Sequence, residues 1–260
     1  MVLADVAVVV PTSPDEALTA FGDGSDVTVV AGGTIVLPDL VAGRLRPKRA
    51  LLLARAGLDG ITRGGGRVTI GATTPVSALE GGDEPLATAA RNVADPEIRG
   101  QATVGGNLCA TASDDAPRGD LQAALIALDA TVRSGGKGGE RSEPVEDFLA
   151  GGAGRLVLDV SYDDTSRQTG YASARRPHAH HYTILAVAAA KRDGELRVAA
   201  TGIGPRAVRL TAVEQSGSAA DALTGLEPRD DALASAWYRS QLLPRLVKRA
   251  LGMLDGAEHA

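Results

Sequence analysis

The stretch AGGTIV at residues 31–36, together with TVGGNL at residues 103–108, decides how this chain is expected to fold. Each stretch interrupts an apolar run and carries no charged side chain. Glycine adopts positive φ angles and lets another backbone or a ligand come into contact with the main chain. Consecutive N–H groups in such turns bind anions, phosphate above all. We therefore predict two walls of one pyrophosphate site, although either stretch alone is also compatible with a simple chain reversal.

The overall composition describes an ordinary globular chain. A length of 260 residues favours one large and one smaller domain, and an apolar fraction of 44% is enough for a folded core. The net charge of -5 and the scattered Lys and Arg exclude nucleic acid and an anionic membrane surface as primary partners. No apolar stretch approaches the length of about 18 residues that a membrane span needs.

Cys109 is the only cysteine of the chain. It excludes an intrachain disulfide and any iron–sulfur cluster held by this chain alone. The first ten residues lack the basic start and the small-residue cleavage site of a signal peptide, so we expect a strand there and a cytoplasmic chain.

The first part of the chain alternates short strands and helices. Ser13 and Glu16 have the spacing of a capping box, with Pro14 at the first helical position, which predicts a helix to about Phe21. β-branched and apolar runs predict strands at 6–10, 27–30, 50–53, 67–70, 130–133 and 156–161. Further helices are expected at 37–42, 73–79, 85–93 and 121–128.

The second part of the chain changes character after the polar stretch 163–170, which we take as a domain boundary. Three antiparallel strands are expected at 170–175, 182–191 and 196–201, with Asp193-Gly194 as the turn between the last two. Helical spacing follows at 210–215, 231–238 and 241–254.

Several longer segments resemble the flavin-binding medium subunit of the molybdenum hydroxylases, the family of carbon monoxide dehydrogenase and xanthine dehydrogenase. They are AGGTIVLPDL, TVGGNLCA, RGDLQAALIALDATV, GYASARRPHAHHYTILAVAAA, ATGIGPRAVRLTAVE and SAWYRSQLLPRLVKRAL, in the family's order. The resemblance implies an α+β protein with a two-subdomain FAD-binding fold of the vanillyl-alcohol-oxidase type. A three-stranded antiparallel sheet with a helical bundle would follow it. The FAD-binding domain would span 1–163, with subdomains of about 1–53 and 54–163, and the C-terminal domain 164–260.

The same resemblance implies which residues contact FAD. The first glycine stretch would wrap the pyrophosphate, and the second would meet it from the other subdomain. Asp120 matches an aspartate that hydrogen-bonds the cofactor, although it could equally cap the helix that follows. The implied set is Val29, Val30, Ala31, Gly32, Gly33, Thr34, Ile35, Val36, Val93, Thr103, Val104, Gly105, Gly106, Asn107, Asp120 and Val157.

The chain departs from the family pattern in four places. Ile35 stands where relatives often have Asp, Ser173 where many have Lys, and His181 where Asp is common. The segment 109–120 is longer than usual by a few residues.

Two other groups of residues invite a chemical role. His178, His180 and His181 could ligate a metal, but no cysteine or nearby carboxylate completes a four-ligand site, so an interface or orienting role is favoured. Cys109 could be a nucleophile, but the sequence places no base beside it, and a packing role beside the flavin is favoured.

The resemblance implies an oxidoreductase subunit that relays electrons through FAD and has no catalytic residues of its own. Electrons would come from an iron–sulfur small subunit served by a molybdopterin large subunit, in a heterotrimer paired into a dimer of heterotrimers. They would leave to NAD, a quinone or oxygen. Two alternatives stay open: a stand-alone FAD oxidoreductase, and a scaffold paralogue that has lost FAD, for which Ile35 and Ser173 are the arguments.

Overall fold

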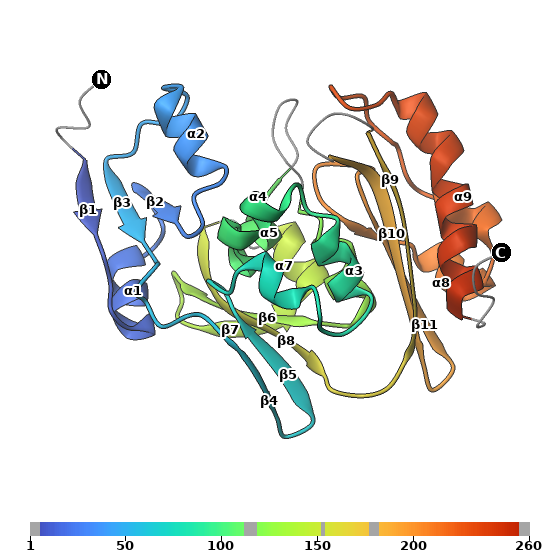
Figure 1. Cartoon of the computed structure of the whole chain (residues 1–260), viewed down its shortest axis with the longest axis horizontal. Helices are drawn as coiled ribbons and strands as arrows, with labels where there is room; N and C mark the ends of the chain where they lie inside the picture. Colours follow the sequence, from blue (N-terminus) through green and yellow to red (C-terminus); the bar gives the residue numbers. More distant parts are fainter. Residues whose placement is uncertain (1–5, 112–118, 152–153, 177–181, 255–260) are drawn as a thin grey trace.

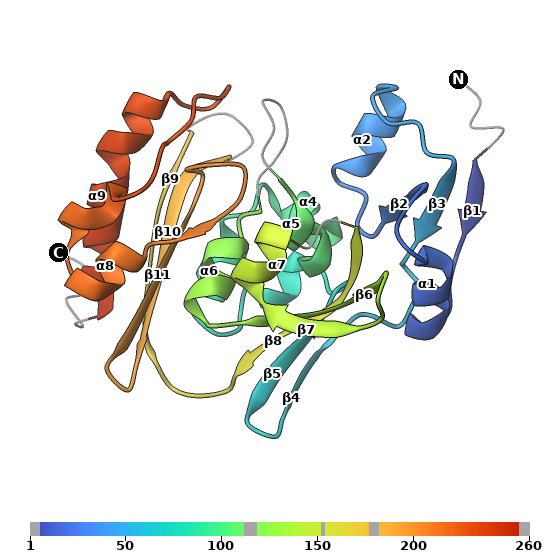
Figure 2. The same cartoon turned by 180° about the vertical axis from the view of Figure 1, so that it is seen from behind.

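The computed structural model describes residues 6–111, 119–151, 154–176 and 182–254, arranged around three sheets that follow one another along the chain (Figure 1). The N-terminal sheet, the central sheet with its helices, and the C-terminal sheet lie in a row, and the view from behind shows the same order (Figure 2). The predicted α+β class is confirmed.

The N-terminal sheet is parallel, in the order β1-β3-β2. Parallel neighbours need crossover connections, which the helices supply. Ser13 caps the first helix as predicted, because its Oγ accepts the Glu16 N–H at 3.2 Å. In a capping box the Glu16 carboxylate would accept the Ser13 N–H, but here it accepts the Thr12 N–H at 2.7 Å. The elements are β1 (Ala7–Val9), α1 (Pro14–Phe21), β2 (Val27–Val30), α2 (Val36–Val41) and β3 (Arg49–Leu52).

The central sheet is antiparallel, in the order β4-β5-β8-β6-β7. Its strands are β4 (Ile61–Gly64), β5 (Arg67–Gly71), β6 (Thr131–Gly136), β7 (Arg141–Pro144) and β8 (Arg155–Asp163). The helices of this part are η1 (Val76–Leu79), α3 (Leu86–Arg91), α4 (Pro96–Gln101), α5 (Val104–Cys109), α6 (Gln122–Ala127) and α7 (Val145–Gly151).

The C-terminal sheet is antiparallel, in the order β12-β11-β10-β9. The three predicted strands are present, and a two-residue strand adds a fourth at the edge, which corrects the predicted number. The elements are β9 (Gln168–Arg175), β10 (Thr183–Arg192), β11 (Glu195–Thr201), β12 (Val208–Arg209), α8 (Thr211–Ser216), η2 (Ala219–Leu223) and α9 (Ala236–Leu254).

The strand β10 shows how the layers are stacked. Its side chains are buried on both faces, because α6 packs against one face and α9 against the other. Successive side chains of a strand point to opposite faces. Ala186 and Ala188 accordingly belong to the central core, whereas Leu185 and Val187 belong to the C-terminal core.

The apolar cores continue across the expected domain boundaries. Leu156 and Leu158 of β8 pack with the N-terminal core, and Tyr171 of β9 packs with the central core. The expected boundaries near 53 and 163 fall between the sheets, and the division into domains stays a prediction.

Some predicted elements were wrong in type or extent. The segment predicted as a helix at 73–79 has only the short helix η1, because Pro75 is extended and bridges to Thr103. The segment at 103–108 is the helix α5 rather than a turn. The helices α4 and α7 were not predicted, and the last two predicted helices are one helix that begins at Ala236. Within the described ranges, no helix is both long and apolar enough to cross a membrane.

Candidate cofactor site

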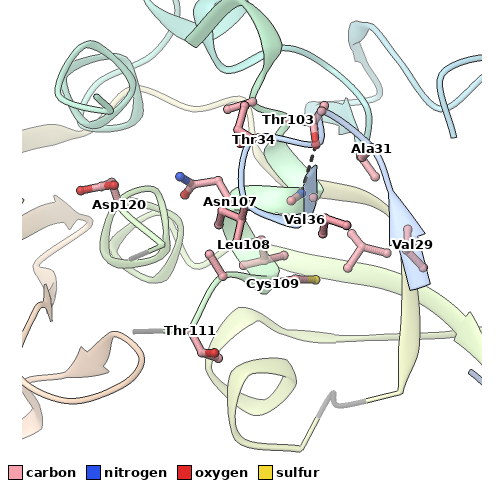
Figure 3. A pocket seen from close by; sticks show the side chains of 18 of the residues that line it. Val29, Ala31, Thr34, Val36, Thr103, Asn107, Leu108, Cys109, Thr111 and Asp120 are labelled. Carbon is pink, nitrogen blue, oxygen red and sulfur yellow. Dashed lines mark hydrogen bonds between the residues drawn. The ribbon is translucent and has the colours of Figure 1, made fainter. Parts of the chain in front are cut away.

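A cavity of about 890 Å³ lies where the three sheets and the central helices meet. Pockets for small ligands and cofactors measure roughly 300–1,000 Å³, so this cavity is at the large end of that range. The loop after β2, both ends of α5 and the end of α7 contribute to its wall. Part of the C-terminal unit, which comprises β9 to α9, contributes as well. Figure 3 shows the side chains of some of the residues that line it.

The first glycine stretch forms the loop between β2 and α2 along one wall of the cavity. Gly33 has a φ of +72°, the left-handed conformation expected for this turn. A Cβ atom at Gly32 would collide with the carbonyl oxygen of Gln101 at the end of α4. Gly32 therefore lets the N-terminal unit approach the central helices closely.

The main-chain N–H groups of this loop belong to residues that line the cavity. None of those from residues 32 to 36 donates a hydrogen bond to a described residue. Ile35 occupies the N-cap position of α2 and no side chain caps the helix. A run of such donors at a helix start binds anions well, because the helix dipole adds to their partial charges.

The second glycine stretch differs from what we expected, because its main-chain donors are already used. The Val104 N–H donates to Thr74 O at 2.9 Å, and the Gly105 N–H donates to Ala72 O at 2.8 Å. The Gly106 N–H donates to Thr103 Oγ1 at 3.2 Å (Figure 3). The prediction of two bare turns is therefore wrong for this stretch.

The two glycines of α5 instead create room. A Cβ atom at Gly105 would lie 2.9 Å from Ala72 Cβ and 3.0 Å from Ala72 O, so Gly105 lets α5 pack on the end of β5. A Cβ atom at Gly106 would meet only Thr103 Oγ1 at 2.9 Å. Gly106 lines the cavity, and its bare backbone leaves space for a ligand there.

Most residues implied by the resemblance come together on this cavity. Val30 and Val104 do not line it: the Val30 carbonyl accepts the Leu53 N–H at 2.9 Å, and the Val104 side chain is fully buried in the central core. The residues that do line it are Val29, Ala31, Gly32, Gly33, Thr34, Ile35, Val36, Val93, Thr103, Gly105, Gly106, Asn107, Asp120 and Val157. Their contacts with FAD stay a prediction.

Asp120 lies in the cavity wall just before α6 and is largely buried. The alternative role as helix cap is wrong, because the N-cap residue is Leu121 and no side chain caps α6. The Leu121 N–H donates instead to Asn107 Oδ1 at 2.9 Å. Asn107 thereby joins α5 to α6 within the wall.

Gln122 is a positioning residue that the sequence interpretation missed. Its side chain is fully buried, and its Nε2 donates to Leu108 O at 2.8 Å and to Ala110 O at 2.9 Å. Its Oε1 accepts the Ala207 N–H at 2.9 Å. A glutamine within the apolar run of 121–128 was the available signal, because a buried amide needs several partners.

The Cys109 thiol opens into the cavity, so it is exposed although protein atoms surround it. Removal from bulk water raises its pKa to about 11, and the positive charge of Arg206 opposes this only in part. A thiol with a raised pKa is a poor nucleophile at neutral pH. This favours the packing role over the nucleophilic one.

Ser173 is partly buried on β9 and does not line the cavity. His178, His180 and His181 fall outside the described residues. Among the described residues, no three His, Cys, Asp or Glu side chains are grouped to hold a metal ion.

A cavity of about 890 Å³ with main-chain anion donors and apolar side chains in its wall is typical of a protein that binds a dinucleotide cofactor. Residues 4–160 match the family described as the FAD binding domain in molybdopterin dehydrogenase. This match covers more than half of the chain, and the chain belongs to that family. FAD as the cofactor and the oxidoreductase class are thereby confirmed.

The chain is similar over nearly its whole length to medium subunits of molybdenum hydroxylases. The carbon monoxide dehydrogenase medium chain of Hydrogenophaga pseudoflava is 28% identical over 273 residues, covering 93% of this chain and 94% of that protein. The 6-hydroxypseudooxynicotine dehydrogenase complex subunit alpha of Paenarthrobacter nicotinovorans is 28% identical, covering 94% and 92%.

Solved structures agree with this assignment. Carbon monoxide dehydrogenase from Hydrogenophaga pseudoflava, in a form that lacks the Mo-pyranopterin moiety, superimposes with a TM-score of 0.85 at 26% identity. The superposition covers 98% of this chain and 99% of that one. Quinoline 2-oxidoreductase from Pseudomonas putida 86 shares the fold, with a TM-score of 0.80 at 22% identity and full coverage of both chains.

Proposed function

We propose that this chain holds FAD in the 890 Å³ cavity and relays electrons through it within a larger enzyme. The observation that carries the proposal is the row of N–H groups at residues 32–36, which have no hydrogen-bond partner among the described residues and which line the cavity together with the open backbone of Gly106. These donors suit the pyrophosphate of FAD, and the apolar wall suits its ring systems.

The residues of this chain bind and orient the cofactor in this proposal. The β2–α2 loop receives the pyrophosphate, and Gly106 leaves room for it. Asn107 joins α5 to α6, and Gln122 joins α6 to the C-terminal unit, so these two residues hold the elements in place around the cavity. FAD itself supplies the redox chemistry, because it accepts and releases electrons singly or in pairs.

Electrons enter from an iron–sulfur small subunit, which receives them from a molybdopterin large subunit, and they leave to NAD, a quinone or oxygen. The relatives named as a medium chain and as a complex subunit support this assignment. The three chains form a heterotrimer, two of which pair, and the complex is cytoplasmic.

Equilibrium titration with FAD tests the proposal. The purified chain is expected to be yellow or to become yellow on FAD addition, and co-expressed iron–sulfur and molybdopterin subunits are expected to co-purify. A stopped-flow measurement of the rate at which the iron–sulfur subunit reduces the bound FAD tests the relay. A chain that is colourless after incubation with excess FAD and removal of the free cofactor supports the scaffold alternative instead. A yellow chain that turns over an organic substrate without partners supports the stand-alone oxidoreductase.

A further inference from the structure

Arg206 places a positive charge in the cavity wall, and no carboxylate of the described residues pairs with it. This residue follows β11, is partly buried, and lines the cavity. Its guanidinium donates a hydrogen bond to the carbonyl oxygen of Leu149 at the end of α7. It forms no ion pair with any described residue. A guanidinium has five N–H donors, so this one contact leaves capacity for an anion.

Other charged residues in the same wall are engaged within the protein. Asp39 pairs with Arg44 at 2.6 Å, and Asp95 accepts the Ile98 N–H at 2.8 Å as the cap of α4. Arg155 donates to Ser134 Oγ, Ser134 O and Gly139 O at 2.8–2.9 Å. Arg206 therefore stands out among these as a charge available to the ligand.

Arg206 lies at the other end of α5 from the pyrophosphate donors. The first turn of α5 holds Gly106, whereas its last residue is Cys109, and the charge of Arg206 acts on the Cys109 thiol. The glycine loop follows β2 of the N-terminal sheet, whereas Arg206 lies in the chain between β11 and β12 of the C-terminal sheet, and these two sheets lie on opposite sides of the central helices (Figures 1 and 2). An extended FAD held at its pyrophosphate thus places one of its ring systems near Arg206.

The chemistry of FAD decides which ring system this is. Adenine carries no charge at neutral pH. The isoalloxazine ring takes up two electrons from a reductant, such as a reduced iron–sulfur protein, and one proton from water, and then carries one negative charge over N1 and the C2 carbonyl. The attraction between a cation and that charge is stronger in a poorly solvated site than in bulk water. Charge near N1 is one of the ways in which a protein tunes a flavin.

We propose that Arg206 faces the N1–C2 carbonyl edge of the isoalloxazine ring and stabilises the reduced cofactor. The inference rests on FAD occupying this cavity, as proposed above. It also orients the cofactor, because the flavin end then points to the C-terminal sheet and the adenosine end to the opposite end of the cavity.

The test is the two-electron midpoint potential of bound FAD in the full chain and in the variant Arg206→Gln, measured by dithionite titration against a reference dye. We expect the potential to fall by about 30 mV or more, which corresponds to a tenfold loss of preference for reduced FAD. Arg206→Lys is expected to retain most of the wild-type potential. Affinity for oxidised FAD, whose ring is neutral, is expected to change less than about threefold, well below the tenfold effect on the reduced form.

Sulfite gives a second readout without electron transfer. Its sulfur lone pair forms a bond to N5, and the resulting negative charge resides on the N1–C2 carbonyl region. We expect Arg206→Gln to weaken sulfite binding about tenfold, in parallel with the potential. The matched control is Arg46→Gln, an exposed residue outside the cavity wall, which is expected to change neither value.

The outcomes separate the two proposals. If the wild-type chain takes up no FAD, the cavity assignment fails and this inference fails with it. If FAD binds and Arg206→Gln leaves the potential and the sulfite affinity unchanged, only the role of Arg206 is overturned. Weaker binding of oxidised FAD at an unchanged potential would place Arg206 at the phosphates or adenosine, which also contradicts the inference.

Discussion

The side-chain oxygen of Gln122 accepts the main-chain N–H of Ala207 at 2.9 Å. This bond joins α6 of the central unit to the C-terminal unit, next to Arg206 in the cavity wall. The amide nitrogen of the same side chain donates to Leu108 O and Ala110 O at the end of α5. One buried residue therefore sets the relative positions of three parts of the site.

The variant Gln122→Leu is expected to lose about 2–5 kcal/mol of unfolding free energy, because it leaves buried backbone groups at Leu108, Ala110 and Ala207 without a partner. Urea unfolding followed by circular dichroism measures this. Gln168→Leu on the exposed start of β9 is the control, with an expected change within about 0.5 kcal/mol. Equal stability of the two variants would show that Gln122 does not hold these parts together.

The variant Gly106→Val is expected to keep the fold and lose FAD, because its side chain extends into the cavity where only Thr103 Oγ1 lies within contact distance. We expect the dissociation constant for FAD to rise at least about a hundredfold, equivalent to about 2.7 kcal/mol. Fluorescence titration measures it.

Variants at two neighbouring glycines serve as comparisons for Gly106→Val. Gly100→Val lies on α4 with no atom near the added side chain, and it is expected to leave FAD affinity within about threefold of wild type. Gly105→Val would press against Ala72 and is expected to destabilise the fold itself. Wild-type FAD content in Gly106→Val contradicts the proposed path of the cofactor.

Cys109 is expected to react slowly with iodoacetamide at pH 7, because its pKa of about 11 leaves on the order of one thiol in 10⁴ ionised. The rate in the FAD-free chain should rise about tenfold per pH unit between pH 7 and pH 10, since only the thiolate reacts. Bound FAD is expected to protect the thiol. A rate that reaches a plateau below pH 9 would contradict the raised pKa of Cys109. A rate that FAD does not lower would contradict its place beside the cofactor.

The C-terminal unit contains a buried ion pair between Arg239 and Asp231. Arg239 Nη2 lies 2.6 Å from Asp231 Oδ1, and both side chains are almost fully buried. Burial lowers the pKa of Arg239, yet its guanidinium donates to Asp231 and to the carbonyl oxygens of Ile184 and Gly202. The variant Asp231→Ala leaves a buried charge without its carboxylate and is expected to cost about 3–5 kcal/mol. The exposed Glu227→Ala is the control. Calorimetry compares the two, and equal melting temperatures would contradict the prediction.

Much of the fold could be predicted because its signals are local. Ser13 and Pro14 marked the start of α1, and Asp193-Gly194 marked the hairpin of β10 and β11. The start of α4 carried a comparable signal in Asp95 and Pro96, which the interpretation did not use. The resemblance of several segments to the medium-subunit family indicated the family and the FAD cofactor. The spacing of residues within single segments did not indicate either.

The remaining features depended on tertiary contacts. Two consecutive glycines disfavour a helix, yet residues 104–109 form α5, because Thr103 caps it and Gly105 packs on Ala72. The pairing of those N–H groups depends on Ala72 and Thr74, which are distant in the sequence, so the sequence does not reveal that this stretch is no bare turn. The exposure of Cys109 and Arg206 to one cavity likewise depends on how three units pack together.

The most direct measurement is a crystal structure of the chain with FAD bound. The account predicts pyrophosphate oxygens about 2.7–3.2 Å from main-chain nitrogens of residues 32–36, with the isoalloxazine ring toward Arg206. A structure in which the pyrophosphate lies away from this loop, with FAD held elsewhere on the chain, would contradict it.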